Sequence, residues 1–217
     1  MHMKKLLMFA AFAVVLCSCG SGNSKKNDTL ANVHEGHEWV DLGLPSGLKW
    51  ATCNVGASSP EEYGDYYDWG ETTTKSKYTE KNFASWGESW GESWGDIGGD
   101  SSRDAATANW GGDWRMPTYE EFMELLNNCR WKWTTQNGHN GYKVTSKKNG
   151  QSIFLPAAGW RYGADENYVG SYGYYWSSTP VEISGTRSAC RLYFNEDSLN
   201  VRWNGRYGGH SVRPVLE

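Results

Sequence analysis

The sequence predicts one α+β domain, with a main helix and a short second helix packed on twisted antiparallel sheets and a loop-rich C-terminal half. Three observations predict this class. Apolar residues recur with helical spacing over only one long stretch, and that stretch begins with a capping motif. Most of the remaining chain alternates polar and apolar residues between Gly- and Asn-rich turns. A chain of 217 residues has room for one such domain with a substantial core.

The main helix is expected to begin at Tyr119. Thr118 and Glu121 form a capping box, in which each side chain accepts from the backbone N–H of the other residue. The apolar residues of this helix recur at i, i+3, i+4 and i+7 and form one stripe: Phe122, Leu125, Leu126 and Cys129. Burying side chains of this size contributes about 1.5–3 kcal/mol each. We therefore expect the helix to dock on a sheet.

Two elements are expected before the main helix. Residues 39–42 and 48–53 alternate around a turn and predict a β-hairpin that opens the domain. Residues 104–110 predict the short second helix, packed beside the main one.

Strands are expected in the rest of the chain. Residues 131–134, 142–147 and 151–155 predict a meander, and Asn149-Gly150 is a type I′ hairpin signal before its last strand. Four short strands are expected after it, at residues 172–178, 189–195, 199–204 and 210–215.

Several short motifs resemble a known family. They are residues 36–57, residues 64–72, Trp-Arg-Met-Pro-Thr (114–118), Phe-Leu-Pro-Ala-Ala-Gly (154–159), Tyr-Trp-Ser-Ser-Thr (175–179) and Ser-Val-Arg-Pro-Val (211–215). In this order they resemble the Fibrobacter succinogenes major paralogous domain family of Bacteroidetes lipoproteins, over about residues 36–216. The resemblance implies a C-type-lectin-like fold, related to formylglycine-generating enzymes and to variable proteins of diversity-generating retroelements. It carries over no catalytic residues.

The N-terminus is typical of a lipoprotein signal peptide. Lys4 and Lys5 precede an apolar run that ends in Leu-Cys-Ser-Cys, which resembles a bacterial lipobox. We expect residues 1–18 to be removed, Cys19 to be lipidated, and residues 19–35 to form a flexible tether to a domain at 36–217. A plain secretory signal is the alternative.

The expected location follows from this anchor. We expect an outer membrane lipoprotein at the cell surface, attached to the membrane only through its lipid. A location on the periplasmic face of the membrane is the alternative. Residues 20–24 lack the acidic residues that usually follow the lipidated cysteine of surface lipoproteins.

Three cysteines remain in the mature chain. Because an oxidising compartment favours disulfides, we expect a bond between Cys53 and Cys129, which would leave Cys190 unpaired. The alternative is that all three are small buried apolar residues.

Charge and spacing exclude several kinds of site. A net charge of −4 and a pI near 5.8 argue against nucleic acid as a partner. Residues 61–71 are acidic but lack a calcium-loop signature, so we expect a solvated loop. His34 and His37 lack the i, i+4 spacing of a zinc helix. No metal and no cofactor are expected.

Residues 75–100 are expected to be a surface insertion. The tetrapeptide Ser-Trp-Gly-Glu repeats within it, and its glycines argue against a helix. The tryptophans of the repeat either form an exposed flap or fold back on the domain.

The C-terminal part of the chain has the composition of a recognition surface. The chain has 13 Trp and 13 Tyr but only 6 Phe, and after residue 159 it uses Arg in place of Lys. Alternation places Leu192, Phe194 and Val212 inside and their neighbours outside. We expect one contiguous exposed ligand-binding patch, made by Trp160, Tyr162, Tyr168, Arg191, Tyr193, Asn195, Arg202, Asn204, Arg206 and Tyr207. The alternative is that these aromatic residues only fill the core.

The function expected from the sequence is a non-catalytic binding module for a glycan or protein ligand. A structural or assembly lipoprotein without a small ligand is the second interpretation, and an enzyme is the third. Oxidative chemistry like that of the formylglycine-generating relatives needs a pair of active-site cysteines. The C-terminal half of this chain contains only one cysteine, Cys190. A glycosidase needs two facing carboxylates, which spacing alone does not identify.

Replacing the expected lipidation site tests the anchor. Cys19→Ala should move the protein from the membrane fraction to the soluble fraction, because the acyl chains are then absent. Fractionation followed by immunoblotting measures this, with Cys17→Ala as the matched control that stays in the membrane. A Cys19→Ala protein that remains membrane-bound contradicts the assignment.

Overall fold

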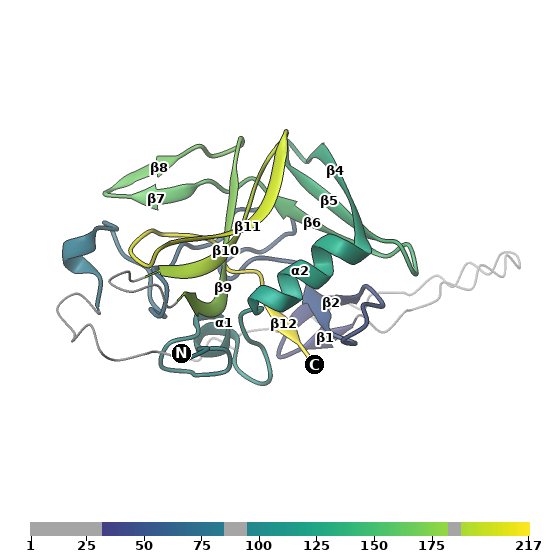
Figure 1. Cartoon of the computed structure of the whole chain (residues 1–217), viewed down its shortest axis with the longest axis horizontal. Helices are drawn as coiled ribbons and strands as arrows, with labels where there is room; N and C mark the ends of the chain where they lie inside the picture. The colour runs from purple at the N-terminus through teal and green to yellow at the C-terminus, as the bar shows by residue number, and fades with distance from the viewer. Residues whose placement is uncertain (1–31, 85–94, 182–187) are drawn as a thin grey trace, which may run out of the picture. The chain divides into compact units, whose positions relative to one another are not determined.

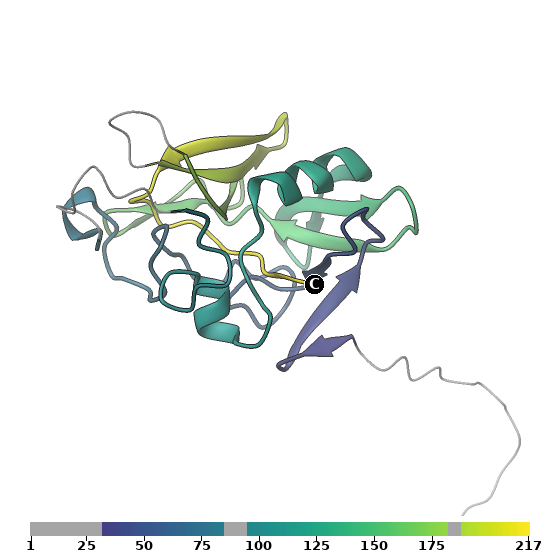
Figure 2. The ribbon, with the colours of Figure 1, turned by 60° about the horizontal axis from the view of Figure 1, so that its bottom comes forward.

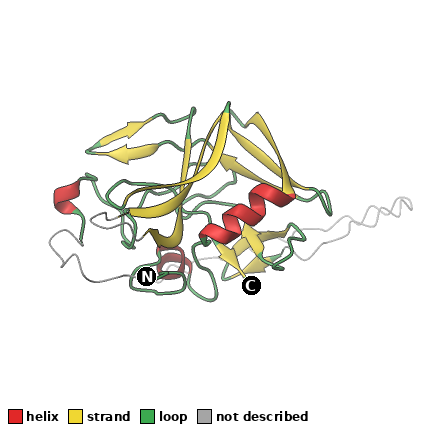
Figure 3. Cartoon of the chain, viewed as in Figure 1, coloured by secondary structure: helices red, strands yellow, loops and turns green. Residues whose placement is uncertain are grey.

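The computed structural model describes residues 32–84, 95–181 and 188–217, and its strands dominate. About 42% of the described residues are in strands or β-bridges and 11% are in helices, and the strands form twisted antiparallel sheets. Figures 1 and 3 show the strands and the few helices. The expected signal peptide, Cys19 and the Trp repeat at 85–94 lie outside the described residues.

The first sheet joins the two ends of the described domain. Its order is β1 (Val33–His34), β2 (His37–Asp41), β3 (Lys49–Ala51) and β12 (Val215–Leu216). The hairpin expected from the sequence is present as β2 and β3, and Trp50 of β3 pairs with Val215 of β12. The last residues of the chain therefore close the sheet that the first strands open.

The expected meander forms the second sheet, of β4 (Cys129–Gln136), β5 (His139–Ser146) and β6 (Ser152–Pro156). The tight turn lies at Asn137-Gly138, where both φ angles are positive (46° and 87°), as a type I′ turn requires. The Asn149-Gly150 turn that the sequence predicts does lie between β5 and β6, but its type I′ geometry is wrong, because Gly150 has a positive φ (76°) and Asn149 does not. The Asn149 side chain donates to the carbonyl oxygen of Asp41, within a longer loop.

The third sheet holds the C-terminal strands in the order β11 (Ser198–Gly205), β10 (Ser188–Asn195) and β9 (Gly173–Val181). A separate hairpin is made by β7 (Trp160–Tyr162) and β8 (Asp165–Asn167). The chain near its end runs beside both, because Tyr175 of β9 bridges Ser211 and Arg161 of β7 bridges Gly209. The expected strand at 210–215 is reduced to these bridges and the short β12.

The main helix is α2 (Tyr119–Asn128), and the prediction of its start and its cap is confirmed. The Thr118 hydroxyl accepts from the N–H of Glu121, and the Glu121 carboxylate accepts from the N–H of Thr118. Phe122, Leu125 and Cys129 are buried, as the stripe predicts. The helix lies between the β9–β11 sheet and the β4–β6 sheet (Figure 2).

Two shorter helices complete the described fold, α1 (Ala105–Trp110) and the 3-10 helix η1 (Glu80–Asn82). The Asp104 carboxylate caps α1 by accepting from the N–H of Ala106 and of Thr107. None of the helices in the described ranges is long and apolar enough to cross a membrane.

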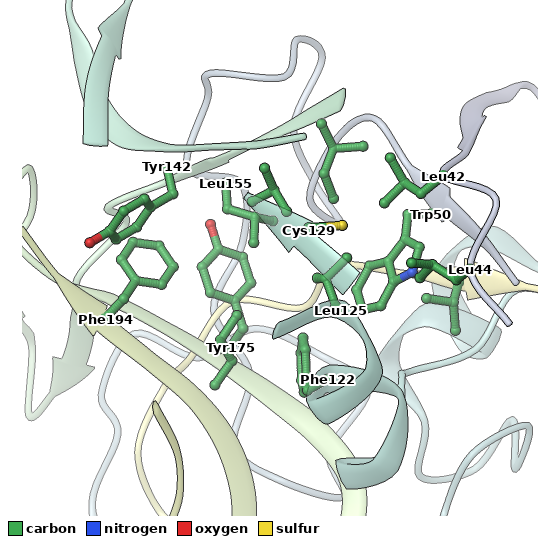
Figure 4. Packing of buried hydrophobic residues seen from close by; sticks show 14 of the residues in the cluster. Leu42, Leu44, Trp50, Phe122, Leu125, Cys129, Tyr142, Leu155, Tyr175 and Phe194 are labelled. Atoms are coloured by element: carbon green, nitrogen blue, oxygen red, sulfur yellow. The ribbon is translucent and has the colours of Figure 1, made fainter. Parts of the chain in front are cut away.

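The third sheet separates two hydrophobic cores. On one side, α2 and the meander bury Tyr175, Leu192 and Phe194, as Figure 4 shows for the two aromatic residues. On the other side, Trp176 and Ala189 pack into a second core. Tyr175 and Trp176 are adjacent on β9 and serve different cores, because side chains alternate across a strand.

Three expectations about packing are wrong. Helix α1 contributes Ala106 and Trp110 to the second core, so it does not share the core of the main helix. Residues 75–100 are no simple surface insertion, because their described flanks include buried Tyr78, Phe83 and Ile97.

The expected disulfide is the third correction. Cys53, Cys129 and Cys190 are all free thiols, and Cys129 lies in the first core whereas Cys53 packs against the second. Burial raises the pKa of the Cys129 thiol to about 11, so the neutral form is favoured. This matches the alternative interpretation for Cys129, which is a small buried apolar residue.

Candidate ligand-binding face

Alternation along β10 divides its side chains as the sequence predicts. Leu192 and Phe194 are fully buried in the first core, and Val212 is buried in the second. Arg191, Tyr193 and Asn195 alternate with Leu192 and Phe194 along β10. They are half-buried and lie on the opposite face of the strand.

The strand register extends this face across the sheet. Arg191 pairs with Arg202 of β11, and Tyr193 pairs with Tyr174 of β9. Directly paired residues of an antiparallel sheet project to the same side. Asn204, two residues after Arg202, shares that side. Tyr193, Asn195, Arg202 and Asn204 therefore share one side of the sheet, but the expected exposure holds for Arg202 alone, since the other three side chains are half-buried.

Aromatic rings make this face continuous. Tyr172 and Tyr174 stack with ring centroids 6.1 Å apart, and Tyr193 lies 5.9 Å from the first ring and 5.4 Å from the second. The series continues at both ends. We call the whole set the aromatic face, and it consists of Trp160, Tyr162, Tyr168, Tyr172, Tyr174, Arg191, Tyr193, Arg202 and His210.

The loop around β7 supplies the outer rings. Trp160 lies 5.8 Å from Tyr162 and 6.2 Å from Tyr174. Tyr162 and Tyr168 are among the exposed large side chains of the chain, 49% and 60% exposed. The turn needs Gly159, whose φ is +66° and where a Cβ would lie 2.3 Å from the carbonyl oxygen of Asn167.

Arg191 is held between two rings of this face. Its Cζ lies 4.6 Å from the ring centroid of Tyr174 and 5.5 Å from that of Tyr193, in cation–π geometry. Its Nε and Nη1 atoms are buried and have no hydrogen-bond partner among the described residues. Burial lowers the pKa of Arg191 to about 10, and the nearby charge of Arg202 acts in the same direction.

His210 closes the inner end of the face. It is fully buried, and its ring stacks on Trp176 at 4.0 Å. Neither ring nitrogen has a hydrogen-bond partner in the described chain. Burial, and then the charge of Arg191, hold the pKa of His210 well below its usual value. His210 is therefore a neutral side chain beneath the rings.

Two predicted site residues lie elsewhere. Arg206 is only 8% exposed, stacks on Trp69 with its Cζ 4.2 Å from the ring, and donates to the carbonyl oxygen of Ser188. The prediction that Arg206 belongs to an exposed patch is wrong, because its guanidinium group makes these contacts inside the domain. Tyr207 is half-buried, and no ring contact joins it to the aromatic face within the described residues.

The sequence prediction missed Tyr172, Tyr174 and His210. Alternation over residues 172–176 carries a signal for the first two, because it places them opposite Tyr175, which lies in the core. No local pattern points to His210, which reaches the face through its bridge to Tyr67.

The acidic residues at 61–71 are not all solvated. Asp68 is buried, and its carboxylate lies 2.5 Å from Nζ of Lys75, so the expectation of a solvated loop is wrong for this residue. Burial raises the pKa of Asp68 to about 6, although Lys75 opposes that shift. Among the described residues, no group of three or more His, Cys, Asp or Glu is placed to hold a metal ion.

A hollow elsewhere shares no residue with the aromatic face. Its volume is about 480 Å³, and it lies between the α1 region and the chain end, lined by Thr107, Trp114, Arg115, Glu217 and neighbouring residues. The aromatic face itself offers ring faces, phenol hydroxyls and guanidinium groups. Rings and guanidinium groups are the side chains that most often carry binding contacts.

Comparison with known proteins adds one match. Residues 133–215 match the model of a family described as a domain of unknown function (DUF8237). The matched region runs from within β4 to β12 and includes every residue of the aromatic face. No curated protein and no solved structure matches the chain.

The buried His210 should make stability depend on pH. Unfolding lets His210 take up a proton that the folded state excludes, so its contribution is present above pH 6.5 and is lost as the pH falls below it. Between pH 7.5 and 5.5 this lowers the free energy of unfolding by about 1.4 kcal/mol. Urea denaturation of wild type and His210→Gln at both pH values measures it. An unchanged pH dependence in the variant contradicts the assignment.

Proposed function

We propose that this chain is a non-catalytic, lipid-anchored cell-envelope module that binds a glycan through the aromatic face. The observation that carries the proposal is the unbroken series of ring contacts from Tyr162 and Tyr168, which are exposed, to Tyr174 and His210, which are buried. Rings fixed by one another lose little entropy when a ligand stacks on them.

The composition of the face favours a sugar over a protein as the ligand. Its exposed rings belong to tyrosines, which join apolar area to a hydroxyl that can bond a sugar. A ligand with apolar ring faces and many hydroxyl groups therefore suits it best.

We also propose the C-type-lectin-like fold that the sequence resemblance implies. Support comes from the single long capped helix, the short second helix, the antiparallel sheets and the loops around β7 and β8. In such a domain the lipid anchor expected at Cys19 supplies membrane attachment and leaves the aromatic face free. Attachment and recognition then reside in separate parts of the chain.

Two matched aromatic substitutions test glycan binding. Tyr193→Ala should raise the Kd for a bound glycan more than about fivefold, because a central contact residue typically contributes over 1 kcal/mol. Trp203→Ala is the control, since Trp203 is 57% exposed but pairs with Cys190, on the other face of the same sheet. Its Kd should change less than about twofold.

The measurement is a glycan array with the purified full-length protein in detergent, followed by calorimetric titration. The melting temperature of each variant confirms its folding. If no glycan is bound, or if both variants lose affinity equally, the proposal fails. A protein ligand bound through Tyr193 in place of any glycan also overturns it.

A further inference from the structure

The two arginines of the aromatic face form no ion pair with a described acidic residue. Neither Arg191 nor Arg202 forms an ion pair with any described Asp or Glu, whereas Arg115 and Lys75 both do. The whole chain carries a net charge of −4, so acidic residues are plentiful. The two arginines are therefore separated from them by the fold.

The two arginines also lie beside each other on the sheet. Arg191 and Arg202 are directly paired across β10 and β11, and both lie against the ring of Tyr193, at 5.5 Å and 5.9 Å. Like charges opposite each other destabilise an antiparallel pair. An anion bound between them would relieve this repulsion.

Arg191 has unused donors in a fixed position. Nε and Nη1 are buried without partners, and Nη2 donates to no described residue and is the nitrogen left accessible. The rings of Tyr174 and Tyr193 hold the guanidinium plane in place. A guanidinium held in this way presents Nη2 to a ligand, and a carboxylate can accept a charge-assisted hydrogen bond from it.

We propose that the glycan bound by the aromatic face is acidic, with a sugar carboxylate that binds Arg191 and is supported by Arg202. This inference rests on the proposed function and specifies its ligand class. The sugar ring would stack on the neighbouring tyrosines while its carboxylate reaches the guanidinium. The site therefore combines stacking with charge recognition.

The test uses pairs of glycans that differ only in charge. The probes are oligogalacturonate, alginate oligomers, heparosan oligomers and sialyllactose, each alongside its own methyl ester. At low salt, at least one acidic probe should bind wild type with a Kd at least tenfold below that of its ester. Raising the ionic strength should weaken the acidic probe more than the ester.

Substitutions assign that difference to the arginines. Arg191→Gln should reduce the tenfold preference to less than twofold, and Arg202→Gln, at an exposed position, should reduce it with little risk to folding. Arg130→Gln is the matched control, because Arg130 is exposed on β4, outside the aromatic face, and should leave the preference unchanged.

The outcomes separate the two proposals. If the esters bind as tightly as the acids, or if only neutral glycans bind, the acidic-ligand inference is wrong while the glycan-binding function stands. If a preference for the acids persists in both Arg191→Gln and Arg202→Gln, the carboxylate binds at another site and the inference also fails. If no glycan of either kind binds, the proposed function itself fails.

Discussion

One buried guanidinium, that of Arg213, joins three segments of this domain that are far apart in sequence. It is fully buried and donates four hydrogen bonds, to Oδ1 of Asn54 and to the carbonyl oxygens of Ala51, Thr52 and Phe154. None of these acceptors is a carboxylate, and burial lowers the pKa of Arg213. The charge is stable inside because several dipoles surround it, and removing it would leave all of them unpaired.

The aromatic face depends on this arrangement through β9. Asn54 also donates to the hydroxyl of Tyr175, which in turn donates to the carbonyl oxygen of Pro156. Tyr175 is thereby fixed in the first core, and its neighbour Tyr174 must project to the other side. The same chain end places His210 and Ser211 along β9. The recognition rings are thus ordered by polar contacts that lie behind them.

Local patterns predicted the parts of the fold that local physics determines. The capping box located the start of α2, and alternation along β10 divided Leu192 from Tyr193. Long-range packing decided the rest. Arg206 and Tyr207 are adjacent in a Gly-rich stretch, and long-range contacts with Trp69 and Ser188 make the former a buried residue. The signal peptide predicts an oxidising compartment, in which Cys53 and Cys129 could form a disulfide, but the fold places them in different cores.

Equilibrium unfolding of Arg213→Met tests most directly whether this guanidinium supports the domain. Because four buried acceptors would lose their donor, the free energy of unfolding should fall by more than about 3 kcal/mol. The exposed Arg130→Met control should change it by less than about 0.5 kcal/mol. A loss of less than about 1 kcal/mol for Arg213→Met would show that the acceptors find other partners, and would contradict the account.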